Sequence, residues 1–175
     1  VVAVEAEPHN VRVARLNCAL NGARNVHVIA AAIAAESGHL YFTEGLNGKV
    51  VPGVRAGKVR VEAVTIDELA GRYGVPDVVF LDVEGYEGHA LRGAAKTLSD
   101  ARTDFFIELH DAEALEAVGD SASAVLQHFV DAQYSLFLAP APEGPVSGNF
   151  RPLDDHASNG QRCYIVGFGP DEGSA

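Results

Sequence analysis

The sequence predicts an α/β domain with a doubly wound, mostly parallel sheet and an antiparallel strand near the C-terminus. The first observation is that strand-like apolar runs alternate with helical patterns along the chain, as in sheets with helices on both faces. The second is the unbroken apolar run Val78–Leu81, which is typical of a parallel strand buried on both faces. Residues 86–98 follow with an apolar stripe at helical spacing.

Four more strands and two helices are expected before this central run. The strands are expected at residues 1–4, 26–30, 38–43 and 58–64. The last two alternate apolar and polar residues, which favours an antiparallel pair. A helix is expected from Pro8 to Asn21, because proline suits the first helical turn and Gly22 favours a stop. Thr65 is a suitable cap for a second helix at residues 66–73.

The second half of the chain continues the alternation. Further strands are expected at residues 104–109, 134–138 and 164–168. A helix capped by Ser121 or Ser123 is expected to run through Val130. Residues 44–57 and 139–162 are rich in turn-forming residues and lack periodicity. We expect these two loops to form the walls of a substrate site, because loops over strand ends usually set specificity.

Composition limits the class of protein. The 175 residues suffice for one domain, expected at residues 1–169, with a disordered tail at 170–175. A formal net charge of −11 argues against nucleic acid or an anionic membrane as a partner. No apolar run could span a bilayer and no signal peptide is visible, so we expect a cytoplasmic location. Cys18 and Cys163 lack a CxxC spacing, which argues against a zinc site or a disulfide framework.

Acidic residues follow the central strand directly. Asp82 and Glu84 occupy alternate positions, so an extended chain points both carboxylates to one side. The carboxyl ends of strands are where open α/β sheets bind ligands. The alternative is that both acids are solvated and favour the next helix through its dipole. With Glu87 they could supply oxygen ligands to Mg²⁺ or Ca²⁺, but the run is a common surface pattern with too few ligands, so no metal site is predicted.

Glu108 and His110 end the strand expected at residues 104–109, and they share one face of it. If this strand lies beside the central one, they meet Asp82 and Glu84 at adjacent carboxyl ends. A histidine titrating near neutrality, or a carboxylate beside another acid, can take a proton from a hydroxyl. The alternative is that His110 merely ends a strand and Glu108 pairs with an arginine such as Arg102.

Glu5 follows the first apolar strand. In nucleotide-binding α/β folds an acid at this place accepts hydrogen bonds from ribose hydroxyls. The alternative is that Glu5 is a solvated turn residue and that Glu7 stabilises the next helix through its dipole. The glycine-rich turn that should precede such an acid by about 20 residues is not in the sequence, and it would lie ahead of Val1.

These motifs, taken together and in this order, resemble the FkbM family of S-adenosylmethionine-dependent methyltransferases. The matching stretches are VVAVEAEPHN, LNG, NVHVIAAAI, VTIDEL, VVFLDVEGYEGHALRGA and IELH, which extend from Val1 to His110. Two residues depart from the family pattern: Phe80 precedes the DVEG motif where a lysine or another residue is common, and Ala6 replaces a usual proline.

The resemblance implies a Rossmann-like fold that binds S-adenosylmethionine. It places Glu5 at the ribose, and Ala30 and Ala31 near the adenine. Asp82 and Glu84 would line the cleft beside the methionine portion of the cofactor and the substrate.

The expected reaction is methyl transfer to a hydroxyl of a small molecule or sugar, with His110 or Glu84 as the base and the enzyme supplying mainly positioning and proton removal. The sequence lacks the family's first strand and glycine loop and contains no methionine. We therefore expect both elements ahead of Val1, and the chain alone to be inactive. The alternatives are a nicotinamide-dependent oxidoreductase of similar architecture and a non-catalytic remnant of the fold.

Overall fold

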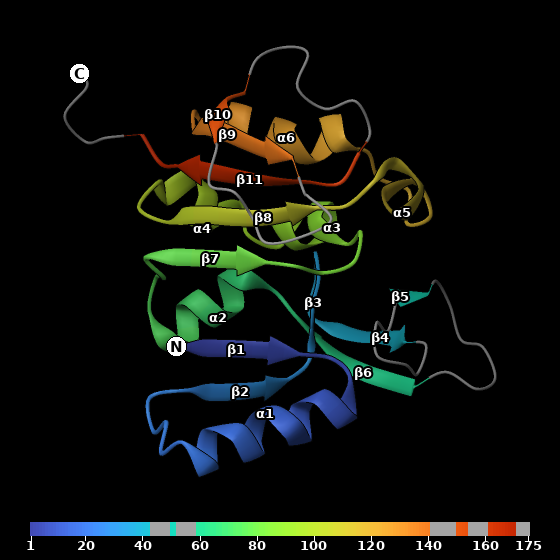
Figure 1. Ribbon diagram of the computed structural model, residues 1–175, viewed down its shortest axis with the longest axis vertical. Coiled ribbons are helices and arrows are strands. Elements are labelled where there is room, and N and C mark those ends of the chain that lie inside the picture. The colour runs from blue at the N-terminus through green and yellow to red at the C-terminus, as the bar shows by residue number, and fades with distance from the viewer. Residues whose placement is uncertain (43–49, 52–58, 141–149, 154–160, 171–175) are drawn as a thin grey trace.

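The protein has a mixed α/β fold with both parallel and antiparallel strand pairs (Figure 1). The computed structural model describes residues 1–42, 50–51, 59–140, 150–153 and 161–170. Most of the two expected loops at 44–57 and 139–162, and nearly all of the expected tail, lie outside the described residues.

The strands are β1 Val2–Glu5, β2 His27–Ala30, β3 Ala32–Ile33, β4 Gly38–Phe42, β5 Val50–Val51, β6 Val59–Val64, β7 Val78–Leu81, β8 Asp104–Leu109, β9 Ser135–Pro140, β10 Arg151–Pro152 and β11 Cys163–Phe168. The helices are α1 Pro8–Leu20, α2 Ile66–Tyr73, α3 Glu87–Arg92, α4 Ala95–Asp100, α5 Ala112–Glu116 and α6 Ala122–Asp131. Among these elements β3, β5, β10 and α5 were not predicted, and all four are short.

The strands form three hydrogen-bonded groups. The largest has the order β10-β9-β11-β8-β7, in which β7 and β8 are parallel and β11 runs antiparallel to both of its neighbours. This confirms that the two acid-bearing strands are neighbours and that the last strand is antiparallel. A second group has the order β3-β6-β4-β5, and its β4–β6 pair is antiparallel as expected. The third is the parallel pair β1–β2.

Helix starts follow the predicted capping chemistry. Pro8 opens α1, and Thr65 Oγ1 accepts a 2.9 Å hydrogen bond from Glu68 N–H at the start of α2. Ser121, one of two predicted caps, accepts a 3.2 Å bond from Ala124 N–H at the start of α6. Each cap satisfies a backbone donor that has no partner within its own helix.

The main core lies between the larger sheet and helices α3 to α6. Alternation along β8 sends Phe105, Ile107 and Leu109 into this core, where all three are fully buried. Phe105 makes edge-to-face ring contacts with Phe129 of α6 and with Tyr134. The same alternation places Phe106, Glu108 and His110 on the opposite face of the sheet.

The prediction that β7 is buried on both faces is wrong for the described part of the chain. Leu81 is buried in the main core and Val79 packs against it, but Val78 is 59% exposed and Phe80 65% exposed. Phe80 stacks on Phe106 of β8, with ring centroids 5.3 Å apart. A physical reason is that, among the described strands, β7 pairs only with β8, so no described strand covers its other edge.

The single helix predicted at residues 86–98 is two helices, α3 and α4, separated at Gly93 and Ala94. A Cβ at Gly93 would lie 2.1 Å from the carbonyl oxygen of Ala34. The chain therefore passes too close to the Ala34 backbone for any residue but glycine at this position. No helix in the described segments is long and apolar enough to cross a membrane.

Candidate active site

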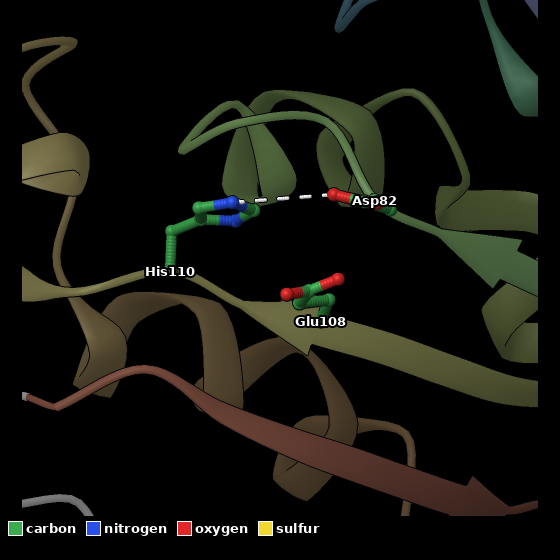
Figure 2. Close-up of side chains that lie close together, drawn as sticks. All are labelled: Asp82, Glu108 and His110. Atoms are coloured by element: carbon green, nitrogen blue, oxygen red, sulfur yellow. Dashed lines mark ion pairs between the residues drawn. The ribbon is translucent and has the colours of Figure 1, made fainter. Parts of the chain in front are cut away.

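The site is built where β7 and β8 end side by side. Their parallel register pairs Leu81 with Ile107. Asp82, the first residue after β7, therefore lies beside Glu108 of β8. His110 follows two residues later on the same face. Ligand atoms of Asp82, Glu108 and His110 all lie within 4.8 Å of one another. Figure 2 shows the Asp82 and His110 side chains pointing towards each other, with Glu108 beside the gap between them.

A strained turn returns the chain towards this cluster after β7. Glu84 has φ 54° and Gly85 has φ 95°, which are left-handed values that only glycine adopts without strain. A Cβ at Gly85 would lie 2.8 Å from the carbonyl oxygen of Ala114. The turn brings Oε2 of Glu84 to 3.4 Å from Nε2 of His110. Asp82 Oδ1 lies 4.0 Å from the same nitrogen.

Glu87 is the residue of this cluster that the sequence did not predict. We predicted that the acidic run containing Glu87 is a surface pattern, whereas Glu87 is 0% exposed. Its Oε1 accepts a 2.8 Å hydrogen bond from Nδ1–H of His110 and a 3.1 Å bond from Gly85 N–H. Because a carboxylate has no proton to donate, Nδ1 of His110 carries the hydrogen and Nε2 faces Asp82 and Glu84. Gly85 and Gly88 lie on either side of Glu87 in the sequence, and these two glycines were the available signal of close packing.

Negative charge surrounds His110. Burial disfavours the charged imidazolium, but the hydrogen bond to Glu87 and the neighbouring carboxylates outweigh it, so the pKa of His110 lies above its ordinary value. The alternative that His110 merely ends a strand does not describe this arrangement, because the ring is buried and contacts three acids.

Glu108 is buried and pairs with an arginine, although not with the one that the sequence suggested. Arg162 Nη2 lies against Glu108 Oε1. Arg102 instead pairs with Asp100, at 2.6 Å. The difference arises because Arg162 directly precedes β11, the strand that is hydrogen-bonded to β8 on the side away from β7.

Glu5 lies at the end of β1, apart from this cluster in the fold. Its two carboxylate oxygens accept hydrogen bonds from Glu7 N–H, at 2.8 Å, and from Asn10 Nδ2, at 3.4 Å. Glu7 caps α1 by accepting a 2.7 Å bond from Asn10 N–H, as the alternative reading of Glu7 expected. The carboxylate of Glu5 is therefore held in place and keeps unused lone pairs, because each oxygen accepts at two sites.

The structure places Ala30 and Ala31 next to Glu5. Ala30 is the register partner of Glu5 across the β1–β2 pair, and Ala31 N–H donates a 3.0 Å hydrogen bond to the Glu5 carbonyl. Ala30 is exposed, whereas Ala31 is 1% exposed. Of the two, only Ala30 offers side-chain surface to a ligand.

Comparison with known proteins gives the family. The profile of the methyltransferase FkbM domain matches residues 1–136, which includes both groups of site residues. The chain belongs to the FkbM methyltransferase family. The resemblance that the sequence motifs indicated is thereby confirmed.

A solved structure shares the fold of this FkbM domain. The chain is similar to the crystal structure of methyltransferase FkbM from Methylobacillus flagellatus KT, with a TM-score of 0.61 and 14% sequence identity. The similarity covers 96% of this chain and 36% of that one, so this chain spans little more than a third of its neighbour's length. No curated protein matches the sequence at a significant level.

Proposed function

We propose that the domain transfers the methyl group of S-adenosylmethionine to a hydroxyl of a small molecule or sugar. The observation that carries this proposal is the meeting of Glu84 and His110, 3.4 Å apart, at the carboxyl ends of β7 and β8 in a chain of a methyltransferase family. Parallel α/β sheets bind their ligands at this edge. The acids there also suit a cofactor whose reacting sulfur carries a positive charge.

We further propose that the sheet is Rossmann-like, with an additional parallel strand between β1 and β7. Among the described strands β1 is paired only with β2, and β7 only with β8. In Figure 1 both strands point to the right, and β1 lies below β7. A strand between them would satisfy both free edges and cover part of the exposed Phe80 side chain.

In this proposal the two groups of residues hold opposite ends of the cofactor. Glu5 accepts hydrogen bonds from the ribose, Ala30 and the backbone near Ala31 form part of the adenine wall, and Asp82 lies at the methionine end. Support for the ribose role comes from the fixed carboxylate of Glu5, whose orientation is set by the start of α1. A group that is already oriented loses little entropy when the ligand binds.

Glu84 is the proposed general base. Its side chain is 32% exposed, whereas that of His110 is 7% exposed, so an incoming hydroxyl reaches Glu84 first. The hydroxyl oxygen forms a bond to the methyl carbon as the carbon–sulfur bond breaks and its electron pair stays on sulfur. The hydroxyl proton passes to Glu84. The products are a methyl ether, S-adenosylhomocysteine and a protonated Glu84 carboxyl group.

The test uses the purified protein, labelled S-adenosylmethionine and a panel of hydroxyl acceptors. Removal of a general base lowers turnover by about 10²–10⁴-fold, so Glu84→Gln should do this while cofactor affinity, measured by calorimetry, stays unchanged. Glu5→Ala should weaken cofactor binding by about 1.5–3 kcal/mol, the value of a hydrogen bond to a charged group. Glu62→Ala, which removes an exposed acid from β6, is the control and should change neither.

The alternatives give different results in a thermal-shift experiment, since a ligand stabilises the protein that binds it. Stabilisation by NAD but not by S-adenosylmethionine would favour the oxidoreductase. Stabilisation by neither would favour a remnant of the fold. Either result would overturn the methyltransferase proposal.

A further inference from the structure

We propose that Asp82, Glu108 and His110 bind a divalent metal ion that accepts both imidazole and carboxylate ligands, such as Mn²⁺ or Zn²⁺. The sequence predicted no metal site, because it offered only the neighbouring acids 82, 84 and 87. The three ligands found here come instead from two strands, and only the parallel pairing of β7 with β8 brings them together.

The spacing of the ligand atoms suits such an ion. All three lie within 4.8 Å of one another. Metal–ligand bonds of about 2.0–2.2 Å in a tetrahedral site place two ligand atoms roughly 3.4 Å apart. The ligand atoms must therefore approach one another by up to roughly 1.4 Å to complete the site. Asp82 can make that movement because its side chain is 43% exposed, whereas His110 is held by its surroundings.

His110 is prepared as a ligand. Its Nδ1–H donates to the fully buried Glu87, which leaves the lone pair of Nε2 directed towards Asp82 (Figure 2). His110 is 6% exposed, and Nε2 has no hydrogen-bond partner among the described residues. Histidines that bind metals almost always donate their other ring N–H to a carboxylate or another acceptor, which fixes the ring and the tautomer. The Glu87–His110 pair has this arrangement.

The local charge also favours a cation. Four carboxylates lie around the His110 ring or beside it, on Asp82, Glu84, Glu87 and Glu108. Arg162 is the one side-chain cation paired with this group in the described part of the chain, and it contacts Oε1 of Glu108. A divalent ion would offset the remaining negative charge, which is unfavourable in a partly buried site.

The metal deepens the proposed function, and its catalytic part rests on that function. A hydroxyl bound to the ion would lose its proton more readily, because a divalent metal lowers the pKa of a bound oxygen. Glu84, which is not one of the three ligands, lies beside the site to receive that proton. Binding of the ion itself does not depend on methyl transfer.

The test is a Mn²⁺ titration of the purified 175-residue chain, freed of metal by a chelator, in which free Mn²⁺ is measured by electron paramagnetic resonance. We expect about one tightly bound Mn²⁺ per chain, displaced by Zn²⁺, because imidazole and carboxylate ligands together suit both ions. Asp82→Asn and His110→Gln should each weaken binding at least tenfold. Glu87→Gln, which changes only the partner of His110, should weaken it by about 10–100-fold. Asp100→Asn, which removes an exposed acid from the end of α4, should leave the affinity unchanged.

Asp82→Asn keeps the test decisive if the variants at buried positions fail to fold, because Asp82 is partly exposed. Absence of stoichiometric Mn²⁺ binding would overturn the metal site, and so would an affinity unchanged in Asp82→Asn. Methyl transfer that proceeds at full rate in excess chelator would refute the catalytic part and leave the proposed function standing. Mn²⁺ binding at this site in a protein that does not bind the cofactor would refute the proposed function and leave the metal site standing.

Discussion

Glu87 and His110 form a buried pair that joins the start of α3 to the end of β8. Glu87 Oε1 accepts a 2.8 Å hydrogen bond from Nδ1–H of His110 and a 3.1 Å bond from Gly85 N–H. One carboxylate therefore orients the imidazole and holds the turn that carries Glu84. The geometry of the site consequently depends on a residue that has no exposed surface.

Glu87→Ala should lower the free energy of unfolding by about 3–5 kcal/mol, because it leaves a buried histidine and a backbone donor without their acceptor. Glu87→Gln should cost less, since its amide oxygen can still accept both hydrogen bonds that Oε1 of Glu87 accepts. Urea denaturation measures both values. Glu62→Ala, at an exposed position on β6, should stay within about 0.5 kcal/mol of the unmodified protein. Equal losses for Ala and Gln would show that hydrogen bonding by Glu87 contributes nothing.

Local rules predicted much of the fold and four of the five residues that meet at the site, all except Glu87. Apolar runs located β7 and β8, and alternation placed Glu108 and His110 on one face. The carboxyl-edge rule then brought Asp82 into the same group. These inferences needed only residues close in the sequence and the assumption that the two strands are neighbours, which the structure confirms.

The remainder depends on contacts between distant segments. Glu87 is buried because its partner, His110, lies 23 positions along the chain, and an acidic run gives no sign of such a partner. The need for glycine at position 93 is set by the backbone of Ala34. The exposure of Phe80 depends on which strands and helices lie beside β7. None of these contacts leaves a periodic pattern in the sequence.

The turn after β7 gives a prediction about backbone strain. Gly85→Ala should destabilise the protein by about 1–3 kcal/mol from its left-handed conformation, and by more from the approach to the Ala114 carbonyl. Gly119→Ala is the matched control, because Gly119 also has positive φ but nothing lies within 4 Å of its added Cβ. Thermal unfolding of the two variants separates the contributions. A Gly85→Ala protein as stable as Gly119→Ala would contradict the close approach.

The two cysteines should differ in reactivity. Burial raises the pKa of the Cys163 thiol to about 11, and the thiolate is the reactive form. Cys18 lies partly exposed on α1. At pH 8 an aromatic disulfide reagent should therefore label one thiol rapidly in the folded chain and two in urea. Cys18→Ser should abolish the rapid phase, whereas Cys163→Ser should retain it, and rapid labelling of Cys163 would show that β11 is more open than the structure describes.

Tyr134 gives a prediction about alkaline pH. Its hydroxyl donates a 2.9 Å hydrogen bond to the carbonyl of Thr103, and burial, with the charges of Asp104 and Asp100, raises the pKa of Tyr134 to about 12. The unfolded value is about 10, so the folded state favours the neutral phenol. The resulting stability is fully present below pH 10, and it is lost as the pH rises from 10 towards 12.

Urea unfolding between pH 8 and pH 11.5 measures this contribution. Tyr134→Phe should be less stable by about 1 kcal/mol at pH 8, the net value of the lost hydrogen bond. The difference between the variant and the unmodified protein should then shrink above pH 10, because phenylalanine cannot ionise. Tyr73→Phe, which alters a side chain that is 45% exposed, should follow the unmodified protein throughout. A Tyr134→Phe difference that stayed constant to pH 11.5 would mean that the pKa of Tyr134 is the same in the folded and unfolded states, and the hydrogen bond to Thr103 would then have to explain the whole effect of the substitution.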